Sequence, residues 1–562
     1  MKQLAIGLSR YTAISDGYDM CSSPVSPASA TDVHYENSRL TTCYSKAKVL
    51  EYMDSFEKNI LNMHPIILPR QLRALVQVFL DTRLQAGRKA PTAGTKRKRS
   101  PISDPDTINA PYKPSKPSID DGLALLVLAL GKACLHKGKM PDMVRSDGLD
   151  GEQQRQPRGL PTQRSPPGSH STSGLPSPKL EDRKGREGAK ELGRQPPFWG
   201  IPMPKRDSSL KNYDVIPGLE YFAPATDILG NQMAGSTLKH VWAHILAGLY
   251  YDQLARPIES FTHITAASRA LLTIFRPLLS RLESYKIRER RDNQLVIAFW
   301  TCSCLESDLL AEMPLVQSGI LNYDMLYPNI SMLNEGGVEL RVCESYIGQL
   351  YLHKRLKMFD EGQSADGGPA LKFRQDMVPE KWVGNQFKFC ESDPPAADIL
   401  SARLRAAYWH TQVAAFRPFI KQILQFSHGI ENHLDVERAA DIRPDLLEHA
   451  GMGINALIES TSVFQGLAKG ERPIITNAFG TAHAQWGNIL VLAACCKSDV
   501  LRRHVDESVL GTLFSRTIDF FELISVGKSA LNTDLNILRA LKKRLFSHAR
   551  ELALRNVGRP AP

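Results

Sequence analysis

Apolar residues recur every three or four positions along most of this chain, which is the spacing of an amphipathic helix. This spacing predicts two helices between about Lys46 and Leu84, separated by the segment HPIILP, because prolines disfavour helical backbone around them. It predicts a third helix in SIDDGLALLVLALGKACLH, where Ser118 and Asp120 have the character of a helix cap. The apolar surface of this third helix needs a partner, so we expect it to pack with the two earlier ones.

From about Pro217 to Arg555 nearly every segment has the period and the length of a helix. Breaks are predicted at ARP near 256, at FRP at 275 and again at 416, at the glycine-rich segment 360–370, and at GERP near 470. There is no series of alternating strands bounded by hairpin turns, and no solenoid period. The predicted fold class is therefore all-α, a large domain of about fifteen or more helices.

Composition divides the chain into four parts. Residues 1–43 are rich in serine and lack periodicity, which predicts a disordered N-terminal segment. Residues 44–136 form a first helical segment, interrupted by a basic loop at 88–117. Residues 137–210 are predicted to be a disordered linker, because eleven prolines and nine glycines fall between positions 141 and 210. Residues 211–556 form the main helical domain.

Positive charge is concentrated in one place. The net charge is +11, and the segment 88–117 holds eight Lys or Arg against two Asp. Its densest part is the tetrad Lys96, Arg97, Lys98 and Arg99. Such a tetrad suits the acidic groove of an import receptor, which predicts a nuclear protein, although a solvated charge run is the alternative. Phosphorylation of the adjoining Ser100 would add about −1.5 to −2 charges and weaken import.

Cysteines and histidines give no metal site. Nine cysteines without a disulfide framework indicate a reducing compartment. Cys302 and Cys304 lie two positions apart, so on a helix they point about 200° apart and are predicted to be core thiols. His240 and His244 could face one ion, but zinc needs further ligands. We therefore expect no metal or other cofactor in this chain.

Catalytic and membrane motifs are also missing. Gly527-Lys528-Ser529 resembles the end of a phosphate loop, but Glu522 occupies the position of its first glycine. The pair Asp120-Asp121 lacks a third carboxylate for magnesium and is interpreted as helix N-terminal charge. No Gly-x-Ser-x-Gly elbow occurs, and no apolar stretch reaches the roughly 20 residues of a membrane span. We expect a protein that is not an enzyme and has no membrane partner.

One acidic residue is predicted to be buried. On a helix that contains Leu295, Phe299 and Cys302, the carboxylate of Glu306 falls on the apolar face. Burying that charge alone would cost several kcal/mol, so a basic partner or several hydrogen-bond donors are expected. Arg417 is the candidate partner. The alternative is a rotated helix that exposes Glu306 to solvent.

Several blocks of the sequence resemble the helical regulatory region of fungal zinc-cluster transcription factors, and the resemblance covers most of residues 45–540. The blocks are LALLVLALGKACLH, DVIPGLEYFAPATDILGN, HILAGLYYDQLARPIESFTHITAASRA, RRDNQLVIAFWTCSCLESDLLAEMPLVQSGI, FRPFI and RPIITNAFGTAHAQWGNILVLAACCKSDVL. The resemblance implies a nuclear regulator of transcription. In such a regulator this region modulates a DNA-binding head and contacts co-regulator proteins or the transcription machinery, with homodimerisation left open.

The chain departs from this family in its cysteines. The family's DNA-binding head is a six-cysteine binuclear zinc cluster that begins Cys-x-x-Cys, and here no two cysteines are three positions apart. Zinc is therefore expected only if a longer form supplies the cluster, and DNA contact only through non-specific basic residues. Those residues are the basic loop and Arg539, Lys542, Lys543, Arg544 and Arg550. The alternative function is a helical small-molecule-binding or enzymatic domain without a recognisable catalytic motif.

Overall fold

The computed structural model describes residues 44–88, 118–142, 212–278, 289–361, 387, 389–390, 392–431, 442–467, 470–527 and 529–557. Within these ranges the chain forms fifteen α-helices and no β-strand, which confirms the all-α class. The predicted import tetrad at 96–99, Ser100 and the N-terminal segment 1–43 lie outside the described residues, as do the basic loop after residue 88 and the linker from 143.

The N-terminal part contains α2 (Lys46–Phe56), the π-helical turn η1 (Glu57–Leu61), α3 (Pro69–Arg88) and α4 (Ile119–Leu135). The break at HPIILP is confirmed, since it separates η1 from α3. The cap of α4 is a capping box, in which Ser118 pairs reciprocally with Asp121. Asp120 instead forms an ion pair with Lys239 at 2.7 Å.

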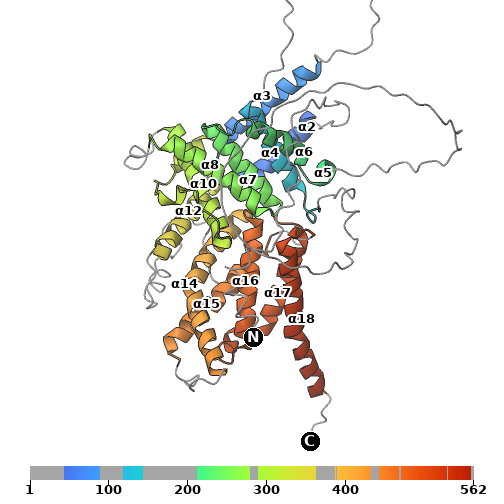
Figure 1. The fold of residues 1–562 in the computed structure, drawn as a ribbon, viewed down its shortest axis with the longest axis vertical. Helices are drawn as coiled ribbons and strands as arrows, with labels where there is room; N and C mark the ends of the chain where they lie inside the picture. The colour runs from blue at the N-terminus through green and yellow to red at the C-terminus, as the bar shows by residue number, and fades with distance from the viewer. Residues whose placement is uncertain are drawn as a thin grey trace, which may run out of the picture. The chain divides into compact units, whose positions relative to one another are not determined.

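Helix α4 is buried along almost its whole length, because its side chains are apolar on every side. It packs against α2 as expected, and also against α6 (Leu219–Gly230) and α7 (Leu238–Gln253) (Figure 1). Gly131 allows α2 to approach closely, since a Cβ there would lie 2.0 Å from the carbonyl oxygen of Tyr52. The hydroxyl of Ser55 donates to the Gly131 carbonyl at 2.9 Å at the same crossing.

The remaining helices follow in chain order and pack mainly as neighbouring pairs. Helix α7 lies beside α8, α12 beside α14, α14 beside α15, and α17 beside both α16 and α18 (Figure 1). Helix α10 packs on α8 and reaches α16. Their bounds are α5 (Asn212–Val215), α8 (Pro257–Phe275), α10 (Arg290–Glu312), η2 (Ile320–Asn322), α11 (Ile330–Glu335), α12 (Leu340–Glu361), α14 (Ile399–Glu431), α15 (Pro444–Ser462), α16 (Ala478–Lys497), η6 (Arg502–His504), α17 (Glu507–Ile524) and α18 (Ala530–Val557).

The predicted breaks near 256 and 275 coincide with helix boundaries, and the one near 470 lies in the connection between α15 and α16, but the break at 416 is wrong. Pro418 lies inside α14, on its exposed side. Proline costs this helix one backbone hydrogen bond. The buried side chains of Phe416 and Ile420, which precede and follow Pro418, pack against α15 and stabilise the helix there. Gly453 of α15 makes that contact close, since a Cβ there would lie 3.1 Å from the Phe416 carbonyl oxygen.

A buried arginine joins the N-terminal helices to the rest of the chain. Arg472 is 1% exposed and donates hydrogen bonds to the carbonyls of Ala133 (2.7 Å) and His136 (3.0 Å), and to Oε1 of Gln253 (3.2 Å). These carbonyls belong to the C-terminal end of α4, where helix carbonyls lack partners within the helix. The guanidinium therefore ties the end of α4 to the end of α7.

The ordered chain continues past α4 into the predicted linker. Met140 is buried and its N–H donates to the Leu523 carbonyl at 2.9 Å, while the Lys137 carbonyl accepts from the N–H of Arg472 at 2.7 Å. Residues 137–142 thus pack with the helices, although composition placed them in the linker.

Among the described helices, α10 is long and apolar enough to cross a membrane by length and composition alone. Most of its apolar stretch is buried within the protein, which is typical of the central helix of a large core.

Candidate functional site: a polar pocket between helices

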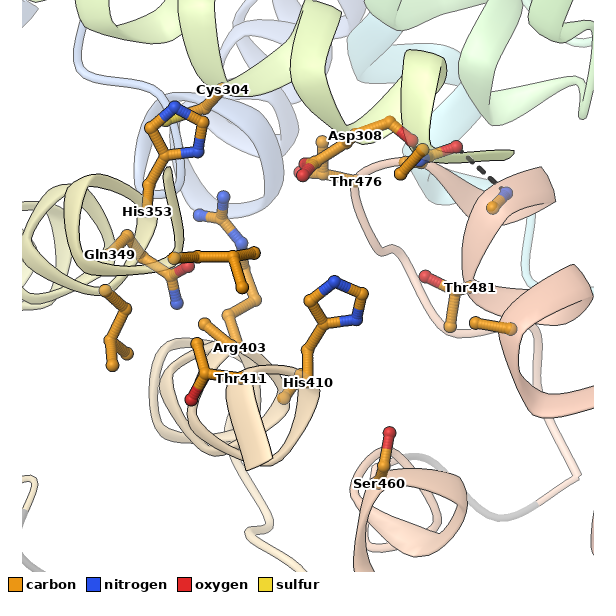
Figure 2. Close-up of a pocket in the computed structure, with 18 of the residues that line it drawn as sticks. Cys304, Asp308, Gln349, His353, Arg403, His410, Thr411, Ser460, Thr476 and Thr481 are labelled. Atoms are coloured by element: carbon orange, nitrogen blue, oxygen red, sulfur yellow. Dashed lines mark hydrogen bonds between the residues drawn. The ribbon is translucent and has the colours of Figure 1, made fainter. Parts of the chain in front are cut away.

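A pocket of about 210 Å³ opens among α10, α12, α14, α15 and α16. Figure 2 shows polar side chains from these helices turned toward one space. The polar lining includes His64, Thr301, Cys304, Asp308, Glu312, Gln349, His353, Arg403, His410, Thr411, Ser460, Thr476, Asn477, Thr481 and Gln485. Such a lining is unusual for the interior of a helical domain, where buried polar groups are normally paired.

Arg403 and Asp308 are the opposite charges of this pocket, and Figure 2 shows them on facing helices, α14 and α10. Burial raises the pKa of Asp308 to about 6, against the opposing effect of the Arg403 charge. Nη1 of Arg403 donates to the Met63 carbonyl at 3.0 Å. Although both residues are described, their charged groups do not form an ion pair with each other.

Asp308 is an exposed residue, yet burial dominates its pKa. The residue is also part of the lining of the pocket. Its backbone carbonyl accepts a hydrogen bond from Nδ2 of Asn477 at 3.3 Å, which fixes the end of α10 to the start of α16. Within the described structure the carboxylate itself has no hydrogen-bond partner.

Helix α12 contributes an amide and an imidazole. Nε2 of Gln349 is buried and has no hydrogen-bond partner in the described structure. Burial lowers the pKa of His353 to about 4, so this imidazole is neutral. On the opposite wall, burial and then the charge of Arg403 lower the pKa of His64, whose Nε2 lies 2.8 Å from Oγ1 of Thr476.

A second carboxylate of the pocket, Glu312, is already paired. It lies 2.6 Å from Nδ1 of His483, whose ring stacks on those of Phe479 and Trp486. Burial lowers the pKa of His483, but the hydrogen bond and charge of Glu312 raise it more, and the net shift is upward. Asp308 is therefore the carboxylate that remains available in the pocket.

Glu306 is fully buried, in agreement with the helical pattern. It accepts hydrogen bonds from Oγ of Ser268 at 3.0 Å, and from the backbone N and Oγ of Ser318 at 2.5 and 2.6 Å. The proposed pairing with Arg417 is wrong. Hydroxyl and backbone donors from α8 and from the loop after α10 surround the carboxylate, and the acidic residue that acts on Arg417 is Glu312.

The described residues contain no group of three or more His, Cys, Asp or Glu that could hold a metal ion. Cys302 is buried, with its pKa raised by burial, while Cys304 faces the pocket. His240 contacts Oγ1 of Thr237 at 2.8 Å, and Nδ1 of His244 lies 3.2 Å from Nδ1 of His263. The two histidines four positions apart thus have different partners.

Two of the basic residues expected to attract DNA are engaged at the surface of α18. Arg539 pairs with Glu522 at 2.5 Å, and Nζ of Lys542 donates to Ser515 at 2.7 Å. Lys543 and Arg544 are exposed, and the side chain of Arg550 lies outside the described residues.

Comparison of the chain with protein-family models, curated proteins and solved structures gave no match. The function must therefore be argued from the residues. Sequence reasoning missed Arg403, Asp308 and Gln349, because they come from three helices that only the tertiary fold brings together.

Proposed function

We propose that this chain is the helical regulatory region of a nuclear transcription regulator of the fungal zinc-cluster type. The observation that carries the proposal is where the resembling blocks lie in the fold. They lie on α4, α6, α7, α8, α10, α14 and α16, which are linked by contacts with one another and contribute much of the hydrophobic core. The sequence blocks of the family are helix-packing patterns, and their meeting in one core is what a shared regulatory fold requires.

In this role the chain acts through its helix surfaces on co-regulator proteins or the transcription machinery, and it reaches the nucleus through the tetrad at 96–99. Its contacts with DNA are electrostatic and read phosphates rather than bases. Sequence-specific recognition would need a zinc-cluster head, which the cysteine spacing of this chain does not provide.

A reporter assay tests the regulatory role. The full chain is fused to an unrelated sequence-specific DNA-binding domain, and transcription is compared with that from the DNA-binding domain alone. We expect the fusion to change reporter output several-fold. A Gly131→Ala fusion, in which α2 and α4 cannot pack, should lose that effect. Unchanged output from a well-expressed nuclear fusion would contradict the proposal.

A localisation experiment tests the import signal separately. Replacing Lys96, Arg97, Lys98 and Arg99 by Ala in a fluorescent fusion should move it to the cytoplasm, while a Lys543→Ala/Arg544→Ala control on α18 should stay nuclear. Undiminished nuclear accumulation of the tetrad variant would refute the signal. A Ser100→Glu variant should show weakened import, and normal import would count against a phosphorylation switch.

A further inference from the structure

Three polar side chains line the same pocket, those of Arg403, Asp308 and Gln349. The guanidinium of Arg403 uses Nη1 on the Met63 carbonyl, and the carboxylate of Asp308 is solvent-accessible and has no hydrogen-bond partner in the described structure. Opposite charges that line one pocket without pairing can each bind a charged group of a ligand. A structural ion pair would bring the guanidinium and the carboxylate together, and the described structure holds them apart on α14 and α10.

The volume of the pocket limits the size of the ligand that it can hold. A volume of about 210 Å³ has room for about seven groups the size of a water molecule, at about 30 Å³ each. This is below the usual range for drug-sized ligands. The lining also has an apolar part, formed by Leu350, Leu356, Ala406, Phe464 and Ala484.

We propose that this pocket binds a small zwitterion of the amino-acid class with a compact apolar side chain. The carboxylate of the ligand lies toward Arg403, and its ammonium group lies toward Asp308. The apolar part of the lining receives the side chain. This inference does not depend on a role in transcription.

Charge complementarity favours a zwitterion over a simple ion. A plain carboxylate would satisfy Arg403 but would place its negative charge near Asp308 and Glu312. A plain amine would satisfy Asp308 but would face the Arg403 charge. A zwitterion carries both charges at once. Its carboxylate can accept hydrogen bonds from the guanidinium of Arg403, and its ammonium group can donate to the carboxylate of Asp308.

Calorimetric titration and thermal unfolding of the full chain test the proposal. The probes are free aliphatic amino acids, one at a time, with the N-acetyl derivative and the methyl ester of each as matched compounds that lack one charge. We expect at least one free amino acid to bind with a Kd of about 1 mM or tighter and to raise Tm, and both derivatives to bind at least about tenfold more weakly.

Two variants locate the site. Asp308→Asn keeps the shape of the side chain and the backbone bond to Asn477, so the chain should fold and its ligand-free Tm should not fall. Its affinity for the amino acid should fall at least about tenfold. Asp54→Asn, at an exposed position on α2, should bind like the parent.

Three results would overturn the proposal: no amino acid binds at about 10 mM, the Asp308→Asn variant binds with unchanged affinity, or the N-acetyl derivative binds as well as the free amino acid. The last result would mean that the pocket accepts anions without regard to the ammonium group.

Discussion

Replacing Arg472 by Met tests how the N-terminal helices are held to the rest of the fold. Methionine has a similar length and is apolar, so it fills the space without supplying donors. The His136 carbonyl, at the end of α4, and Oε1 of Gln253 would then lose their donors in a site that is 1% exposed, and the Ala133 carbonyl would keep only the hydrogen bond from the His136 N–H at 3.3 Å.

The magnitude follows mainly from the two acceptors that lose every donor. A buried acceptor left without a donor costs about 1–3 kcal/mol, so these two together give about 2–6 kcal/mol, and the weakened Ala133 carbonyl adds about 1 kcal/mol. Removing the guanidinium also relieves the cost of burying its charge, which offsets several kcal/mol. We therefore expect a net loss of about 1–3 kcal/mol, a sizeable part of the 5–15 kcal/mol by which folded domains are usually stable.

Urea unfolding followed by tryptophan fluorescence measures this loss, with Arg443→Met as the matched control. The side chain of Arg443 is 75% exposed and its partner Asp445 is also at the surface, so this control should cost at most about 1 kcal/mol. If the Arg472→Met midpoint matches that of the control, the buried guanidinium does not hold α4 in place and the reasoning fails.

Four further outcomes are expected. Because the net pKa shift of His483 is upward, its stabilisation is complete below about pH 6.5 and is lost as pH rises through the folded-state pKa; Tm should fall over that window, and less steeply in His483→Gln. Gly131→Ala should cost about 3 kcal/mol or more in urea unfolding, whereas Gly487→Ala, where a Cβ meets no atom within 4 Å, should be neutral or stabilising. Ser268→Ala removes a donor from buried Glu306 and should cost about 1–3 kcal/mol by the same assay. Binding of the purified chain to duplex DNA should fall steeply with salt and show little sequence preference; tight, salt-resistant binding to one sequence that is lost on metal chelation would contradict this.

Local patterns predicted most helices because each depends on residues close together in the chain. The burial of Glu306 was predictable for the same reason, since a helical wheel places it among apolar neighbours. Its partners were not, because Ser268 lies 38 positions away on another helix and no local spacing marks it. Serine hydroxyls are uncharged, so nothing in the sequence marks them as partners of a buried carboxylate. The predicted basic partner, Arg417, is therefore wrong.

Tertiary packing explains the two other differences from the sequence-based expectations. Proline predicted a break at 416–418, but side-chain packing of α14 on α15 outweighs one lost backbone bond. The pocket has no sequence motif at all, since Arg403, Asp308 and Gln349 each read as a surface charge or amide on its own helix. The one sequence feature that distinguishes them is that they are polar residues on helices that are otherwise largely apolar.

The burial of α4 on every side changes how deletions in this chain should be interpreted. An allele that begins near residue 211 would not produce a smaller folded protein. It would leave the surfaces of α6 and α7 that face α4 uncovered, and cells remove polypeptides with such exposed apolar surface through chaperones and proteases. A null phenotype from that deletion would report protein turnover, so assigning a lost interaction to residues 1–142 requires point substitutions at solvent-facing positions together with a measurement of protein abundance.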